Sequence, residues 1–314
     1  MISAALRQIM SASVILLLAM TCLVLIIHLV PGDPATTLLG PRATEASKAA
    51  LRSQMGFDDP IPVQVFSFIL KVLHGDLGID VISRRPISAI VLGQLPYTMT
   101  LIGVSILLAA CIGIPLGCYS ALHRNGSVDN LIGVLSIAAI AMPSFVIAIY
   151  CVLLFSITLK VLPAIGVGRQ SDMLDQIIHL VLPALAIGLN WVGYLARFIR
   201  SSLLEVLGER HIQSARAHGL TESRILFSYA LPLAILPTVT VIGVSVGPLI
   251  SAAVLTEIVF ARPGIGKLMF DSIAQRNYPV VMAVVLVTTV LLVVCTTIAD
   301  LLNGLIDPRV RHRS

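Results

Sequence analysis

Long apolar runs separated by short polar segments dominate this chain, and six of them have the length of a membrane-spanning helix. The first covers residues 9–30; its 22 residues exceed the apolar core of a cleaved signal peptide, so we expect a retained transmembrane helix. The other five lie at about 97–121, 131–158, 179–200, 232–256 and 280–304. The pattern therefore predicts an all-α membrane protein with six transmembrane helices.

Two of these runs carry a pair of glycines four positions apart, Gly113 with Gly117 and Gly243 with Gly247. This spacing puts two small residues on one helix face and favours close packing of a neighbouring helix.

Residues 31–96 form the longest segment without a membrane-length apolar run. Thr44 and Glu45 provide a helix start, so an amphipathic helix is predicted over 45–55. A second is predicted over 63–73, before a turn at 75–78. The aspartates of this segment are typical of turns and caps, with metal binding as the alternative.

Composition supports the membrane class. Hydrophobic residues make up 57% of the 314 residues, charged residues 12%, and the mean hydropathy is +0.98, whereas soluble domains carry about 25% charged residues. The net charge of +5 comes from Lys and Arg spread between apolar runs, without a basic stripe, which argues against nucleic-acid binding. The five cysteines lie in apolar runs without CxxC spacing, so we expect buried packing residues.

The basic residues predict the orientation. The two termini and the loops on their side hold ten arginines, whereas the short loops of the other side hold five Lys or Arg residues. Short cytoplasmic loops carry the positive excess, so both termini and the loop 201–231 should be cytoplasmic and 31–96 external. The count for that loop includes Arg197, Arg200, Arg210, Arg216 and Arg224.

Sequence motifs for catalysis are missing. The run 263–267 resembles a phosphate-binding loop, but Ala261 and Leu268 stand where such a loop requires Gly and Ser or Thr. We therefore expect that the chain does not hydrolyse ATP. An intramembrane enzyme is the weak alternative. A secondary transporter would need inverted repeats and midplane ionisable residues.

Two polar residues of the fourth span, Asn190 and Trp191, are candidates for lining a solute path. Packing against the helix bundle is the alternative interpretation for both.

The polar run 211–232 predicts a docking element. Small residues precede Gly219, which can end a helix at positive φ. Thr221 and Glu222 then provide an N-cap and an acid for a second helix, which is predicted to end at Pro232. The alternative is an ordinary solvated loop.

This run resembles the EAA loop of permease subunits of ATP-binding-cassette (ABC) importers. Counted from Gly219, the EAA positions are Gln213, Ser214 and Ala215, and the loop ends with Leu231 and Pro232. The spacing is kept, while Gln213, Ser214 and Tyr229 replace the usual Glu, Ala and Ile. Its Ala-Arg-Ala core is similar to that of the peptide and nickel branch.

Further motifs extend the resemblance from about residue 23 to 311. They are Pro31-Gly32-Asp33-Pro34, Gly75-Asp76-Leu77-Gly78, the run 257–281 and the ending Asp307-Pro308-Arg309. Asn277 stands where that family usually has Asp.

The resemblance implies the type I importer permease fold in a bacterial inner membrane. It assigns residues 1–30 to the N-terminus and first span, 31–96 to an external segment, 97–304 to a five-helix core and 305–314 to a cytoplasmic tail. Gln213, Ser214, Ala215, Gly219, Leu231 and Pro232 would couple transport to ATP hydrolysis. The implied partners are a second permease, two ATPases that bind ATP and Mg²⁺, and an external solute-binding protein. The chain itself would hold no cofactor. Peptides are the expected cargo, with nickel chelates, glutathione or another small solute as alternatives.

Overall fold

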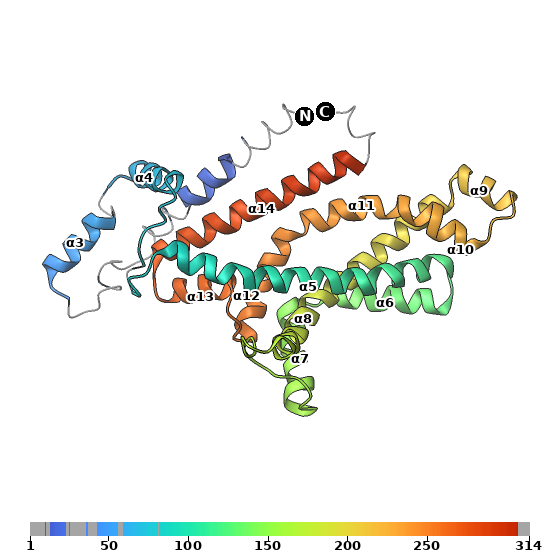
Figure 1. The fold of residues 1–314 in the computed structure, drawn as a ribbon, viewed down its shortest axis with the longest axis horizontal. Helices are drawn as coiled ribbons and strands as arrows, with labels where there is room; N and C mark the ends of the chain where they lie inside the picture. The colour runs from blue at the N-terminus through green and yellow to red at the C-terminus, as the bar shows by residue number, and fades with distance from the viewer. Residues whose placement is uncertain are drawn as a thin grey trace. The chain divides into compact units, whose positions relative to one another are not determined.

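The computed structural model describes residues 10, 13–22, 25, 36, 43–55, 59–80 and 82–306, and every regular element in these ranges is a helix (Figure 1). One isolated antiparallel bridge joins Ile79 and Pro86. In chain order the helices are α3 (Glu45–Met55), α4 (Ile61–Leu73), α5 (Ile87–Leu122), α6 (Ser127–Ala141), α7 (Ser144–Cys151), the π-helix η1 (Val152–Thr158), α8 (Met173–Leu207), α9 (Arg210–Ala217), α10 (Glu222–Arg224), the π-helix η2 (Ile225–Ala230), α11 (Leu231–Val244), α12 (Val246–Val259), α13 (Ile265–Ala274) and α14 (Tyr278–Ile306).

The chain is an all-helical membrane protein with four or five long apolar helices in its described part. The fifth candidate is the pair α6 and α7–η1, which is bent by 100°. The first predicted span, 9–30, falls partly outside the described residues, within which a short helix covers Ser13–Cys22. The other four candidates are Ile87–Leu122, Met173–Leu207, Glu222–Gly243 and Tyr278–Ile298.

Two of the predicted spans contain breaks. The span 131–158 breaks before Pro143, since proline lacks the N–H that a continuing helix needs. The span 232–256 is divided at Ser245, whose hydroxyl donates to the Ile242 carbonyl at 2.6 Å. The prediction that Gly243 and Gly247 share one helix face was therefore wrong, because the two residues belong to α11 and α12.

The described helices form two compact units, each considered by itself. Unit 1 comprises residues 1–97 and 264–294, and unit 2 comprises 98–263 and 295–314. In unit 1, the first turns of α5 pack against α13 and α14 around Ile87, which is fully buried. The inner face of α4 packs against α14 through Val65. Both α4 and the start of α5 therefore pack against the first turns of α14.

The segment before α5 follows the sequence prediction closely. Helices α3 and α4 confirm the two predicted amphipathic helices, and the Thr44 hydroxyl accepts the N–H of Ser47 at 3.3 Å. Gly75 and Gly78 adopt φ of 76° and 84°. Asp76 accepts the N–H of Gly78 at 2.8 Å, which confirms its turn role. Residues 31–35 and 307–309, which carry two of the family motifs, lie outside the described residues.

A buried carboxylate, Asp80, holds the loop that leads into α5. It accepts the backbone N–H groups of Ile82 (3.2 Å) and Ser83 (2.8 Å) and the side-chain amide of Asn277 (2.6 Å). Burial raises the pKa of the Asp80 carboxyl, but the hydrogen bonds from Ser83 and Asn277 outweigh it and hold this pKa below its usual value. Asp80 is therefore an ionised anchor inside unit 1.

Helix α8 forms the centre of unit 2. Its buried residues recur at helical spacing, and α6, α7, α11 and α12 pack around it. A Cβ placed on Gly117 of α5 would lie 2.6 Å from the Ala196 carbonyl oxygen, and one on Gly113 would lie 2.9 Å from that of Val192. The Gly113 and Gly117 pair therefore brings α5 against the α8 backbone, as its spacing predicted.

All five cysteines are free. Cys118 and Cys151 are buried, as predicted, and Cys295 is half-buried. The prediction was wrong for Cys22 and Cys111, which are exposed because their helix faces are not covered by the described part of the chain.

Candidate functional site

The polar segment after α8 folds into a short helix, α9, and a sharp turn. Gly219 has φ of 79°, and its N–H donates to the Arg216 carbonyl at 2.9 Å. The N–H of Leu220 reaches the Ala215 carbonyl at 3.3 Å. These two hydrogen bonds, from the residues after the helix to carbonyls of its last turn, define a Schellman motif. The residue after the C-cap of this motif adopts a left-handed conformation. The predicted role of Gly219 as a helix stop is thus confirmed.

Helix α9 has two different faces. Ile212 is fully buried and Ala215 is 9% exposed, and both pack against the end of α8 and against η2. Gln213 and Ser214, between them, are exposed. The buried cluster on which α9 rests contains Cys118, Ala121, Ile199, Leu203, Val206, Ile225, Leu226, Ala230 and Ala234.

The six residues implied by the resemblance therefore have different environments. Gln213, Ser214 and Gly219 are exposed on the helix and turn, and Pro232 is exposed on α11. Ala215 faces the core of its own chain, and Leu231 is half-buried against the same cluster. The Gln213 amide donates to the Gly208 carbonyl at 3.3 Å, close to the start of α9.

A salt bridge closes the turn. Arg216 Nε lies 2.7 Å from Glu222 Oε1, and Nη2 lies 3.1 Å from Oε2. Hydrogen bonding to this carboxylate raises the pKa of the Arg216 guanidinium, which stays charged. The contact joins the last turn of α9 to the first residue of α10.

The capping prediction for the second helix was only partly right. Thr221 has the extended conformation of an N-cap, φ −68° and ψ 145°, but its side chain makes no capping hydrogen bond. Glu222 does occupy the first turn, where its carboxylate contacts Arg216.

The predicted helix end at Pro232 was wrong, because α11 continues to Val244. The π-helix η2 precedes the proline, and the N–H of Leu231 donates to the Leu226 carbonyl, five residues back. A π-turn changes the hydrogen-bond register, and proline is tolerated in the first turn of the following α-helix. The helix therefore passes through Pro232 without breaking.

A charge pair lies beside the cluster that supports α9, because Arg200 follows Ile199 of that cluster in α8. Arg200 Nε lies 2.6 Å from Asp129 Oδ1, and Nη2 lies 2.7 Å from Oδ2. Asp129, 4% exposed, also accepts the Asn125 N–H at 2.9 Å and the Ser120 hydroxyl. The network joins the end of α5 and the start of α6 to α8.

Sequence reasoning missed this network and counted Arg200 only as a loop cation. The available signal was a lone Asp in the first turn of an apolar helix, since such a carboxylate needs a partner when it is buried.

The two candidate path residues lie on different faces of α8. The Asn190 amide donates to the carbonyls of Ala139 and Ile140, both at 3.1 Å, beside the break between α6 and α7. It replaces hydrogen bonds that the break removes. Trp191 is half-buried, and its ring meets the ring of Tyr194 edge-on at 5.4 Å.

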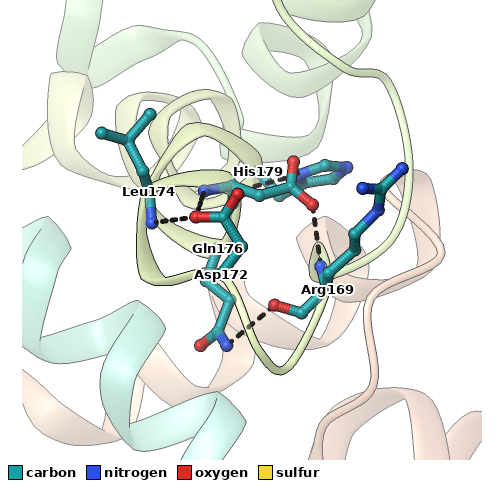
Figure 2. Close-up of polar contacts among 6 residues, drawn as sticks. Arg169, Asp172, Leu174, Gln176 and His179 are labelled. Atoms are coloured by element: carbon teal, nitrogen blue, oxygen red, sulfur yellow. Dashed lines mark hydrogen bonds and ion pairs between the residues drawn. The ribbon is translucent and has the colours of Figure 1, made fainter.

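Figure 2 shows the opposite end of α8, which a local capping network fixes. Asp172 accepts the N–H groups of Leu174 (3.0 Å) and Asp175 (3.3 Å). Asp175 accepts the Arg169 N–H at 2.8 Å and lies 3.2 Å from the His179 ring nitrogen. Capping of this kind stabilises a helix start. In the described part of the chain, no three His, Cys, Asp or Glu residues could hold a metal ion.

Comparison with known proteins identifies the family. Residues 113–312 match the binding-protein-dependent transport system inner membrane component, and residues 1–102 match the N-terminal region of these membrane components. The chain belongs to this permease family. Permeases of this kind are transport subunits of ABC importers rather than enzymes; they hold no cofactor, and a partner ATPase hydrolyses ATP.

The permease has curated relatives along its whole length. It is 38% identical over 322 residues, 94% of each chain, to a probable D,D-dipeptide transport system permease protein of Escherichia coli (strain K12). It is 35% identical over 305 residues, 96% of each chain, to an oligopeptide transport system permease protein of Bacillus subtilis (strain 168). A glutathione transport system permease protein of Salmonella typhimurium (strain LT2) is 33% identical over 313 residues, 100% of each chain. The permease therefore belongs to the peptide and nickel branch.

A solved structure shares the fold. A chain of the inward-facing MetNI methionine ABC transporter superimposes with a TM-score of 0.59 at 17% identity, covering 69% of the permease and 96% of that chain. The permease is thus similar in structure to the type I importer permeases.

Proposed function

We propose that this permease moves dipeptides or oligopeptides across a bacterial inner membrane by alternating access. An external solute-binding protein delivers the peptide, and two cytoplasmic ATPases drive the cycle. Both termini lie in the cytoplasm, six spans cross the membrane, and residues 31–96 form the external segment. A core over 97–304 carries the cytoplasmic loop 201–231, and 305–314 is the tail. The dipeptide and oligopeptide relatives support this cargo.

The geometry of α9 is the observation that supports coupling. Its inner residues, Ile212 and Ala215, are fastened to the ends of α8 and η2, while Gln213 and Ser214 are free to meet an ATPase. A force applied to α9 reaches α8 directly, and α11 through η2, by way of close-packed side chains, which transmit displacement because they have little room to yield. Leu231 belongs to the inner contact, and Gly219 and Pro232 set the backbone around it.

In this proposal a second, similar permease completes the path, and α8 lines it with its exposed face. Trp191 is half-buried against a buried cluster formed by α5, α8 and α12, and its ring contacts Tyr194. Asn190 contributes by holding the break between α6 and α7 in place, with its amide directed at main-chain carbonyls.

Uptake of a labelled dipeptide tests the cargo. Cells that lack this permease, with its partner subunits intact, should lose uptake, and the intact gene should restore it. Uptake that persists in the deletion strain would remove this dipeptide as a required cargo.

Glutathione is the second candidate cargo, because the glutathione transport system permease of Salmonella typhimurium aligns over the whole chain. Nickel chelates or another small solute follow from the resemblance to the branch. The same strains, supplied with labelled glutathione or nickel, separate these cargoes from peptides.

A further inference from the structure

An open cavity of about 400 Å³ lies between α6 and α8. It is lined by Ile140 from the last turn of α6 and by Tyr194, Arg197 and Phe198 from one face of α8. Sites for small ligands enclose about 300–1,000 Å³. The volume is therefore sufficient for a solute of the size of a short peptide.

Aromatic rings form most of the α8 wall. The rings of Tyr194 and Phe198 are nearly parallel, with centroids 6.3 Å apart, and the ring of Trp191 meets Tyr194 edge-on at 5.4 Å. The three rings follow the i, i+3, i+7 positions of one helix face. Tyr194 and Phe198 line the cavity and give it an apolar wall with one hydroxyl group, while Trp191 supports the ring of Tyr194 from the side.

Arg197 is the charged member of this wall. It ends a stretch of 21 residues, 176–196, that contains no Asp, Glu, Lys or Arg. Its side chain is exposed, and among the described residues the structure records no hydrogen bond or ion pair to its guanidinium. Arg200, one turn further, is neutralised by Asp129. A cation at the end of an apolar span requires water or an anionic partner, and the cavity is where this partner can bind.

The two helices that form the cavity are held rigidly together. Asn190 of α8 hydrogen-bonds the α6 carbonyls of Ala139 and Ile140. A Cβ placed on Gly193 would lie 2.7 Å from the Ser136 carbonyl oxygen, so the backbones touch there. Groups fixed in this way can orient a ligand without first being ordered.

We propose that Arg197 binds the carboxylate of the transported solute, while the rings of Tyr194 and Phe198 pack against its apolar part. This assignment rests on the proposed peptide function and makes it more specific, because it defines the cargo as an anionic or zwitterionic small molecule. A planar guanidinium suits a carboxylate, to which it can make two parallel hydrogen bonds. The site lies on α8, on the side of the span that leads to α9.

The test compares two substrates in the complete transporter, reconstituted with its partner subunits. Labelled alanyl-alanine carries the carboxylate, and its C-terminal amide does not. Because the binding protein also discriminates between them, the quantity measured is the acid-to-amide ratio of initial uptake rates in each permease variant. Dividing the ratio of the variant by that of the parent cancels the contribution of the binding protein.

Arg197→Gln should lower this ratio about tenfold, the factor expected for one charge-assisted hydrogen bond. Arg197→Lys should give an intermediate ratio, because an ammonium keeps the charge without the planar fork. Arg124→Gln removes the same charge from an exposed loop outside the cavity and should leave the ratio unchanged. ATP hydrolysis stimulated by the binding protein, measured in parallel, reports assembly.

An unchanged ratio in Arg197→Gln would overturn the proposal, even if both uptake rates fell together, as they would if Arg197 bound a lipid phosphate. If the parent transports too little amide to measure, the KM of the free acid decides. A rise of about tenfold in Arg197→Gln alone supports the site, and an unchanged KM contradicts it. A parent that transports neither compound would refute the peptide cargo, and this inference with it.

Discussion

The side-chain amide of Asn277 donates a 2.6 Å hydrogen bond to the carboxylate of Asp80, across 197 positions of sequence. Both residues are buried in unit 1, Asp80 in the loop before α5 and Asn277 just before α14. An amide can donate to an ionised carboxylate, whereas a second carboxylate cannot unless it is protonated. Asn277, which departs from the family pattern, therefore keeps a single negative charge at this contact.

Asn277→Asp should make the stability of unit 1 depend on pH. Two carboxylates at this distance share a proton, so the second ionisation of the pair shifts to a pKa above that of the unfolded chain. Below the pKa of the unfolded carboxyl, about 4, the pair holds its shared proton and contributes its full stability. This contribution is lost as pH rises through the raised pKa of the folded pair. We expect a loss of about 2 kcal/mol at pH 7.

Thermal unfolding of the permease in detergent between pH 4 and 8 measures this effect. The deficit of the variant relative to the parent should be largest at pH 7–8 and smallest near pH 4. The parent also loses the contribution of Asp80 in acid, because the folded pKa of this carboxyl is depressed. As a control, Gln275→Glu also replaces an amide by a carboxylate, but at an exposed position, and should leave stability nearly unchanged. A deficit independent of pH would show that the introduced carboxylate is not paired with Asp80.

The ion pair of Asp129 and Arg200 should behave as one unit. Asp129→Asn leaves Arg200 without its partner, and Arg200→Gln leaves a buried carboxylate. Each variant should lower the midpoint of thermal unfolding by about 5–10 °C. The double variant should lose clearly less than the sum, because removing both partners leaves no unpaired charge. Strict additivity of the two shifts would mean that the pair contributes nothing as a pair.

Close packing at Gly117 should make even a methyl group costly. In Gly117→Ala the new Cβ would lie 2.6 Å from the Ala196 carbonyl oxygen and 2.9 Å from the Cβ of Ile199, so α5 and α8 must separate. We expect a loss of about 2 kcal/mol in thermal unfolding experiments. Gly103 lies on the same helix with nothing within 4 Å of an added Cβ. Gly103→Ala should be neutral or slightly stabilising, by up to about 1 kcal/mol. Equal effects at the two glycines would contradict the packing explanation.

Gly219 should tolerate substitutions according to backbone conformation rather than size. Nothing lies within 4 Å of an added Cβ there, but φ is 79°. Asn adopts this conformation readily, whereas a β-branched Val is strained by about 1–2 kcal/mol. Gly219→Asn should therefore keep most of the parental uptake. Gly219→Val should lose about nine-tenths of it while the complex still assembles and hydrolyses ATP, if a strain of about 1.4 kcal/mol falls on the coupled state.

Uptake and ATP hydrolysis, measured in the same reconstituted vesicles, distinguish these outcomes. Parental uptake in Gly219→Val would show that the left-handed turn is not needed for coupling. Loss of assembly in that variant alone would assign the turn to docking.

Local signals in the sequence predicted much of this structure correctly. The helices over 45–55 and 63–73, the turn at Gly219 and the small helix face at Gly113 and Gly117 each depend on residues within one or two turns, although the partner helix of that face was not predicted. Such features follow from backbone preferences and periodicity, which a sequence states directly.

Features that depend on distant partners could not be predicted in this way. The pairing of Asp80 with Asn277 and of Asp129 with Arg200 requires knowledge of which helices meet. The continuation of the helix through Pro232 depends on the π-turn before it, because the Leu231 N–H shifts its acceptor to Leu226. Helix propensity predicted that the helix ends at the proline. The π-turn shifts the hydrogen-bond register there, so the helix continues.

The two faces of α9 have a consequence for specificity. Ile212 and Ala215 secure the helix to its own chain, so the exposed positions Gln213 and Ser214 contribute little to folding. Substitutions at such exposed positions change the stability of the fold little, so these residues can diverge while every variant still folds. If α9 contacts the ATPase as proposed, exchanging a few of its surface residues in a laboratory chimera should adapt this permease to a different ATPase.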